Sequence, residues 1–294
     1  MGIFFPINFL YICNVINRSC MKGIINDKNI TRPEHSILTI YIGSEQFSFS
    51  IYDPDEAGSY FYGELTNENQ TGDFSAFKEA FFEQTFFSLP FKKVWIMNRA
   101  PVFAFIPDSI YNDDCRDDFI NFLFSDRQGI PMTNSVPSGQ LTVLYQMPEA
   151  IHRFMLRSFA QPEFIHYSTP LITYFLEDSK KSDVRQMVVN LQKDGLDIFC
   201  FSTGVFLLGN HFPCKGLSNA LYYIMFTWKQ LCLNQTDVFL YITGNNVFKE
   251  ELIEKLELYI RQIYFPEAPP EIYFEGVDTD CIPFELTALS SCEL

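Results

Sequence analysis

The chain has 294 residues, of which 47% are hydrophobic and 19% are charged, and its formal net charge is −15. This length suggests about two domains, and the apolar content is too high for an intrinsically disordered chain. Nucleic acids are bound by clusters of Lys and Arg. The acidic balance and the absence of such clusters therefore exclude a nucleic acid as an expected partner, and we expect a soluble globular protein.

The N-terminus contains an apolar stretch at residues 3–16. It is too short to span a bilayer, and it lacks the positive charge and the cleavage site of a signal peptide. We predict that residues 1–30 are a tail and that Met21 is the true start. A membrane or envelope attachment would require residues 1–20 to be native. The eight cysteines form no C-x-x-C pair, which indicates reduced thiols and a cytoplasmic location.

The first third of the chain shows strand, strand, strand, helix and strand patterns in that order. Residues 37–42 are an apolar run of strand length, and residues 47–52 alternate between apolar and polar side chains. A third strand is predicted at 60–62. A helix capped by Asp73 follows, with phenylalanines on one face. Residues 93–97 are predicted to form a buried strand.

The middle of the chain is less regular. Asp113 or Asp114 is predicted to cap a short helix. That helix is expected to bury Phe119, Phe122 and Leu123. The other elements predicted here are strands at 102–106, 141–146 and 164–167 and a helix at 148–158.

The polar segment at 177–183 is the predicted domain boundary, and the first pattern recurs after it. Asp194-Gly195 and Thr203-Gly204 are typical of tight turns between strands. The predicted elements are strands at 186–191, 196–201, 205–208 and 238–242 and helices at 217–232 and 248–259.

The repeated order predicts a duplicated α/β lobe. Each lobe is expected to hold a mixed β-sheet flanked by helices, with a cleft between the lobes. Lobe I is assigned to residues 31–178, with an irregular insertion at about 101–170, and lobe II to residues 179–294.

Three segments resemble a known family: ILTIYIGSEQFSFSIYD, KKVWIMNRAPVFAFIPDSIY and QMVVNLQKDGLDIFCF. They resemble an uncharacterised family of Bacteroidetes proteins, domain of unknown function 3822. They also fit the two-lobed plan of the actin, Hsp70 and sugar-kinase superfamily, the actin-like ATPase (RNase H-like) fold. The resemblance covers about residues 30 to 275, and none of the three segments is a catalytic motif.

The superfamily resemblance implies a place for ATP and Mg²⁺ between the lobes. There the first hairpin turn of each lobe offers backbone N–H groups to phosphate, and the first strand ends in Asp-x-Gly. The matching residues here are Tyr41 to Gly43, which keep the glycine without the carboxylate, and Asn190 to Gln192, which keep neither. The loop that contacts adenosine in the superfamily, usually with a Gly-Gly pair, corresponds here to residues 242–246, which keep one glycine, Gly244. The candidate cleft residues are Gly43, Ser44, Glu45, Asn190, Gln192, Asp194, Gly244, Asn245 and Asn246.

Loss of the carboxylates removes the preferred ligands of Mg²⁺, on which phosphoryl transfer depends. The leading hypothesis is therefore a non-catalytic binding or scaffold protein that has a protein partner and needs no cofactor. The alternative is an ATP-dependent phosphotransferase or ATPase that uses Glu45, Asp194 and the Gly244 loop. No metal site is predicted, because the four histidines lack ligand spacing.

Overall fold

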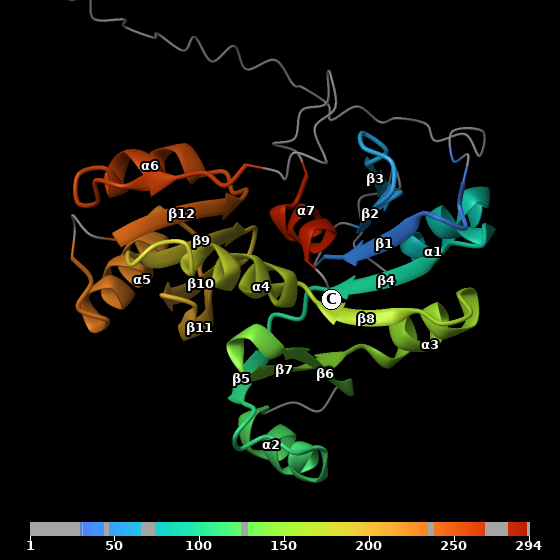
Figure 1. Cartoon of the computed structure of the whole chain (residues 1–294), viewed down its shortest axis with the longest axis horizontal. Helices are drawn as coiled ribbons and strands as arrows, with labels where there is room; N and C mark the ends of the chain where they lie inside the picture. The colour runs from blue at the N-terminus through green and yellow to red at the C-terminus, as the bar shows by residue number, and fades with distance from the viewer. Residues whose placement is uncertain are drawn as a thin grey trace, which may run out of the picture.

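Two five-stranded sheets lie side by side in the computed structural model, with a three-stranded sheet beside them (Figure 1). The sheet β3-β2-β1-β4-β8 defines lobe I, and the sheet β11-β10-β9-β12-β13 defines lobe II. Both sheets have their strands in the order third, second, first, fourth, fifth. This confirms the predicted duplication of an α/β lobe. The structure describes residues 30, 32–43, 47–65, 74–124, 129–234, 238–267 and 282–292.

Lobe I is built around β1, which pairs antiparallel with β2 and parallel with β4. Ile40 lies opposite both Phe49 and Ile96. The phenylalanines Phe77 and Phe81 of α1 are buried against this sheet, as the helical pattern predicts. The elements of lobe I are β1 (Ile37–Ile42), β2 (Phe47–Tyr52), β3 (Phe61–Leu65), α1 (Phe74–Glu83), β4 (Lys93–Asn98), α3 (Glu149–Ser158) and β8 (Glu163–His166).

A small domain, called the insertion below, interrupts lobe I between β4 and α3. Its sheet has the order β5-β7-β6, and its own core includes Ile106, Ile120, Phe124 and Leu144. The strand β6 was not predicted, because its sequence IPMTNSV shows neither a continuous apolar run nor a clear alternation. The elements of the insertion are β5 (Phe103–Pro107), α2 (Arg116–Leu123), β6 (Ile130–Val136) and β7 (Leu141–Met147).

Lobe II repeats the plan, and its first four strands are longer than those of lobe I. Thr203 and Gly204 link β10 to β11, and both have positive φ angles, of 52° and 76°. Such angles suit the tight turn that a twisted hairpin requires, so the predicted turn is confirmed. The elements of lobe II are β9 (Arg185–Gln192), β10 (Gly195–Ser202), β11 (Val205–Pro213), α5 (Leu217–Gln230), β12 (Val238–Gly244), α6 (Lys249–Leu256) and β13 (Ile263–Tyr264).

Two helices join the lobes. The helix α4 (Ser168–Ser179) leads from lobe I into lobe II, and α7 (Phe284–Ser291) packs against it between the two sheets (Figure 1). Neither helix was predicted. Eight of the twelve residues of α4 are buried and only a narrow strip reaches solvent, so its sequence lacks the broad polar face that marks a surface helix.

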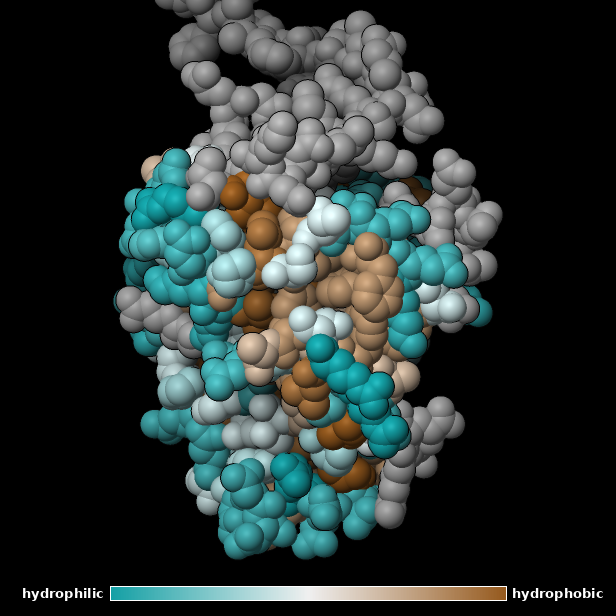
Figure 2. Space-filling model, turned by 90° about the vertical axis from the view of Figure 1, so that its right-hand side faces the viewer, coloured by the Kyte–Doolittle hydropathy of each residue, from teal (hydrophilic) through white to brown (hydrophobic). Residues whose placement is uncertain are grey.

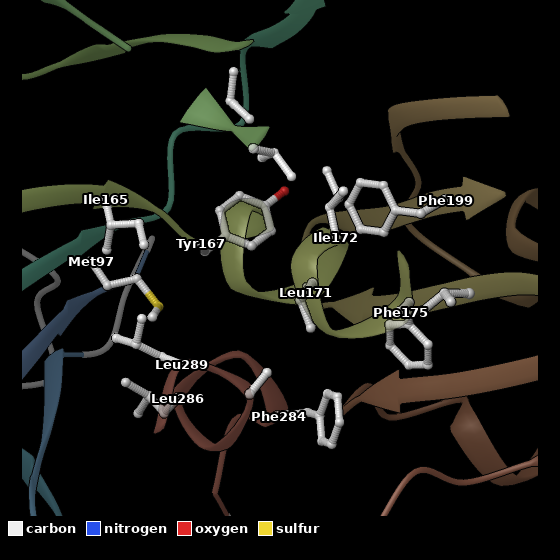
Figure 3. Close-up of a cluster of buried hydrophobic side chains, with 14 of the residues drawn as sticks. Met97, Ile165, Tyr167, Leu171, Ile172, Phe175, Phe199, Phe284, Leu286 and Leu289 are labelled. Carbon is white, nitrogen blue, oxygen red and sulfur yellow. The ribbon is translucent and has the colours of Figure 1, made fainter. Parts of the chain in front are cut away.

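One apolar core spans both lobes at these helices. Figure 3 shows side chains of α4 and α7 between Met97 and Ile165 of lobe I and Phe199 of lobe II. Leu171 of α4 and Leu286 of α7 are also fully or almost fully buried there. Each such side chain contributes about 1.5–3 kcal/mol by leaving water. Separating the lobes would expose this core.

The short helix of the insertion differs from its prediction. Neither Asp113 nor Asp114 caps it: α2 begins after Cys115 without a side-chain cap, and Asn112 instead caps the preceding 3-10 turn (Asp113–Cys115), where its side chain accepts a hydrogen bond from the backbone N–H of Asp114 at 2.7 Å. The expected buried face is also wrong: Phe122 is 86% exposed, Leu123 is exposed and Phe119 is half-buried. The helix is anchored instead by Ile120 and by Phe124 just beyond its end.

Two further residues lie outside the helices predicted to hold them. Cys232 follows α5 with a φ angle of 50°, the left-handed conformation that commonly ends a helix, and Tyr259 follows α6. Cys200 and Cys214 are buried free thiols, whereas Cys232 is exposed. In the part of the chain that the structure describes, no helix combines the length and apolar character needed to cross a membrane.

The two faces of α2 predict opposite responses to truncation. Ile120→Ala should lower the free energy of unfolding by about 2–5 kcal/mol, because it leaves a cavity in the core of the insertion. Phe122→Ala should change it by less than about 0.5 kcal/mol in dilute solution, because this side chain is exposed. Urea unfolding followed by circular dichroism measures both values. Equal losses for the two variants would contradict the observed burial.

Candidate functional site

An ion pair joins the two lobes close to the end of β1 in lobe I and the end of β9 in lobe II. These are the first strands of the two lobes. Arg99 follows β4, and its backbone N–H donates to the carbonyl oxygen of Ile42 at 2.9 Å, beside Gly43. Its guanidinium Nη2 donates to Oδ1 of Asp194, in the turn between β9 and β10, at 2.5 Å. The side chain of Arg99 is 3% exposed and that of Asp194 is 47% exposed.

The negative charge of Asp194 is paired with the guanidinium of Arg99. Partial burial would raise the pKa of the Asp194 carboxyl, but the hydrogen bond and positive charge of Arg99 outweigh it and hold the pKa below its usual value. The turn acid that the sequence offers as a replacement metal ligand is therefore occupied by a guanidinium. Arg99, which connects the chain beside Gly43 to Asp194, was not predicted as a site residue.

A second contact lies at the end of β1, where the superfamily has its first aspartate. Tyr41 donates its hydroxyl to Oε1 of Glu285 on α7 at 2.8 Å, and both residues are buried. Oε2 of Glu285 has no hydrogen-bond partner among the described residues. Burial raises the pKa of Glu285, and burial together with the nearby Glu285 raises the pKa of Tyr41. We call Tyr41, Arg99, Asp194 and Glu285 the interlobe junction.

In lobe II, Asn190 serves the packing of its own sheet. Its amide nitrogen donates to Oδ2 of Asp197 at 3.3 Å, and its carbonyl oxygen accepts from Thr243 at 3.0 Å. Asp197 is fully buried and also contacts Nδ1 of His211 at 2.8 Å. The side chain of Asn190 is thus held within lobe II.

The adenosine-loop candidates also have local roles. Gly244 has a φ angle of 71°, and a Cβ atom there would lie 2.1 Å from the carbonyl oxygen of Leu191. Only glycine fits this contact between β12 and β9. Asn246 donates from Nδ2 to the carbonyl oxygen of Gln192 at 2.6 Å. The side chain of Asn245 is exposed.

The structure thus places the predicted residues in two groups. Gly43 and Asp194 meet through Arg99, whereas Asn190, Gln192, Gly244 and Asn246 lie together at the ends of β9 and β12. Ser44 and Glu45 lie outside the described residues, as do the predicted start at Met21 and all but the last residue of the predicted tail. Arg99 could have been suspected, because it is a charge at the end of an apolar strand.

The described residues offer no group of three His, Cys, Asp or Glu side chains that could hold a metal ion. His166 illustrates the structural use of such residues. Its ring contacts Oγ of Ser168 at 2.6 Å and the carbonyl oxygen of Ala100 at 2.9 Å, and burial lowers its pKa to about 3. The junction suits Mg²⁺ poorly, since Asp194 is paired with Arg99 and burial raises the pKa of Glu285, which disfavours its charged form.

The family is shown by the sequence itself. Residues 25–263 match the model of a family described as protein of unknown function (DUF3822). The chain belongs to this family. No curated protein matches the sequence.

Solved structures confirm the predicted actin-like ATPase fold. A protein of Bacteroides thetaiotaomicron, described as having an actin-like ATPase fold and unknown function, matches with a TM-score of 0.78 and 27% identity. The match covers 92% of this chain and 100% of that one. A chain of the PilM–PilN type IV pilus biogenesis complex matches with a TM-score of 0.53 and 13% identity, over 86% of this chain and 96% of that one.

Removing one partner of the ion pair between Arg99 and Asp194 should destabilise the folded protein. Asp194→Asn should lower the free energy of unfolding by about 1–3 kcal/mol, because it leaves the buried guanidinium of Arg99 without its counter-charge. The loss is smaller than for a fully buried pair, because solvent screens the partly exposed carboxylate of Asp194. The double variant Arg99→Met with Asp194→Asn should regain part of that loss. Urea unfolding at pH 7 measures both variants.

The same substitution predicts a pH dependence. The pKa of Asp194 is lower in the folded state than the unfolded value of about 3.9, so the ion pair stabilises fully above that value and its contribution is lost as pH falls further. The gap between wild type and Asp194→Asn should thus be constant from about pH 5 to 7 and shrink at lower pH. Glu177→Gln, which breaks the exposed pair with Lys180, is the control and should cost under about 0.5 kcal/mol. An equal cost for both variants would contradict the assignment.

For Glu285, the predicted change of stability with pH has the opposite sign to that for Asp194. Because its pKa is raised in the folded state, ionisation as pH rises destabilises the folded chain relative to a neutral side chain. The stability of Glu285→Gln relative to wild type should therefore increase between pH 4 and pH 8, by about 1.4 kcal/mol for each unit of pKa shift, starting near the unfolded pKa of about 4.3 and levelling off above the folded pKa. Thermal unfolding across this range measures the difference. Glu257→Gln, at an exposed position, is the control. A pH-independent difference for Glu285→Gln would contradict the buried state of this carboxyl.

Proposed function

We propose that this protein is a non-catalytic, cytoplasmic binding or scaffold protein with an actin-like fold and a degenerate nucleotide cleft. The observation that carries the proposal is the Arg99–Asp194 ion pair, which bridges the lobes at the turn where the superfamily offers backbone groups to phosphate. The guanidinium and the carboxylate neutralise each other there. A phosphate chain would have to break this pair before it could bind.

The chemistry at the end of β1 supports the same proposal. Phosphoryl transfer relies on a metal held next to the phosphates by carboxylate ligands. Tyr41 takes the place of that acid, and its hydroxyl is donated to Glu285. A buried tyrosine whose pKa is raised is a poor ligand for Mg²⁺.

An ATP-dependent phosphotransferase or ATPase is the second candidate, and the retained Gly244 turn favours it. The positive φ angle of Gly244 would suit a loop that approaches a nucleotide closely. The contact with the carbonyl oxygen of Leu191 accounts for the same glycine through strand packing alone. The Gly244 turn is therefore weaker support for an ATP-dependent enzyme than the ion pair of Arg99 and Asp194 is for a non-catalytic protein.

A protein partner fits the fold better than a small substrate. In the PilM–PilN complex, a chain of this fold is found together with another protein of type IV pilus biogenesis. The likeness is one of fold, and it supports the idea that such a frame can serve as a docking platform. The described surface also carries large exposed apolar side chains, such as Phe82 and Phe122.

A thermal-shift measurement tests the proposal. A ligand at 100 times its Kd adds about 2.7 kcal/mol to the folded state, which raises the Tm of a chain of this size by a few degrees. We expect Mg·ATP at millimolar concentration to shift the Tm by less than about 1 °C, because the phosphate position is closed by an ion pair. Mg²⁺ alone and Mg·ADP are the controls.

A shift of several degrees with Mg·ATP would overturn the non-catalytic proposal. Hydrolysis above the buffer rate, abolished by Asp194→Asn, would then establish the second candidate. Asp108→Asn, in the insertion and away from the interlobe junction, is the matched control for loss of one aspartate.

A further inference from the structure

The two most exposed phenylalanines of the described residues lie on different helices, and each has a charge one helical turn before it. Phe82 of α1 is 72% exposed and Phe122 of α2 is 86% exposed. Lys78 precedes Phe82 by four residues, and Asp118 precedes Phe122 by four residues. Residues four apart share a helix face. The two faces therefore have the same layout with opposite charge.

The face on α1 is part of a larger aromatic surface. Phe82 meets Phe154 of α3 edge-on at 5.8 Å between ring centroids, and Phe154 meets Phe74 in the same way at 5.7 Å. The Nζ of Lys78 lies over the ring of Phe74 at 4.5 Å. Figure 2 shows an apolar area on the side of lobe I that carries these helices. We call Phe74, Lys78, Phe82 and Phe154 the α1 face.

The face on α2 is smaller and acidic. Phe122 points away from the core that Ile120 and Phe124 anchor, and Asp118 is exposed beside it. Neither Asp118 nor Lys78 takes part in an ion pair with another described residue. In Figure 1, α2 lies at the end of the insertion, away from α1. We call Asp118 and Phe122 the α2 face.

We propose that the α1 face of one molecule binds the α2 face of a second copy of this chain. When α1 and α2 of neighbouring copies lie side by side in the same direction, Lys78 faces Asp118 and Phe82 faces Phe122. Both contacts form together, because each pair is separated by four residues and thus by about 6 Å along its helix. The contact joins a lysine to an aspartate and stacks two aromatic rings.

The geometry determines the kind of assembly. The two faces are different surfaces, so the contact is head-to-tail rather than two-fold symmetric. Each copy keeps a free α1 face at one end and a free α2 face at the other, so further copies can add. The chain as a whole is strongly acidic, which makes a lysine on an aromatic surface a selective docking point for the aspartate of another copy.

Sedimentation velocity of the full chain, from about 1 to 100 µM at low salt, tests the proposal over the range of weak protein contacts. We expect the average mass of the wild type to rise above 34.2 kDa with concentration. Phe82→Ser and Phe122→Ser should each remain monomeric. Leu258→Ser, which removes a side chain of 73% exposure from lobe II, is the control and should behave as wild type.

Mixing the two serine variants gives the decisive result. Phe82→Ser keeps an intact α2 face and Phe122→Ser keeps an intact α1 face, so an equal mixture should form a one-to-one complex that grows no further. Lys78→Glu and Asp118→Lys should each weaken association by about tenfold or more, and the double variant should recover it. A monomeric wild type, or a mixture that stays monomeric, would overturn the proposal. A wild-type dimer unaffected by the four substitutions would overturn it as well.

Discussion

The contact between Arg99 and Asp194 is the constraint on which the rest of the interlobe junction depends. It links the residue after β4 in lobe I to the first hairpin turn of lobe II, and the guanidinium is almost completely buried. A buried charge costs several kcal/mol unless it is paired, so the lobes are held at the spacing that keeps this pair formed. The apolar core of α4 and α7 packs between the lobes at the same spacing.

The same junction shows how residues at the expected strand ends of an actin-like fold can be used for contacts within the protein. Tyr41 occupies the strand end of the expected acid, and the acid it meets, Glu285, comes from α7. Asn190 and Asp197 are bound to each other inside lobe II. Many polar groups at this position thus pair with one another across and within the lobes, although Oε2 of Glu285 and Nε of Arg99 have no hydrogen-bond partner among the described residues.

The sequence predicts the sheets well and the junction poorly, for physical reasons. Strands such as β1, β9 and β12 are short apolar runs between turns, and such local patterns suffice to locate them. The helix α4 was missed because most of its residues are buried, so no broad polar face reveals its helical period. Glu285 was missed because its partner lies 244 residues away in sequence, a separation that no local pattern encodes.

That long separation has a consequence for the order of folding. The first three strands of each sheet are close in sequence, so they can pair soon after their segments are synthesised, whereas β8 joins β4 only after the insertion has been made. The core between the two sheets includes Leu286 and Leu289 of α7, so it stays incomplete until this last described helix has been translated. The two lobes therefore form first and dock late, and docking is the step that long-range contacts slow.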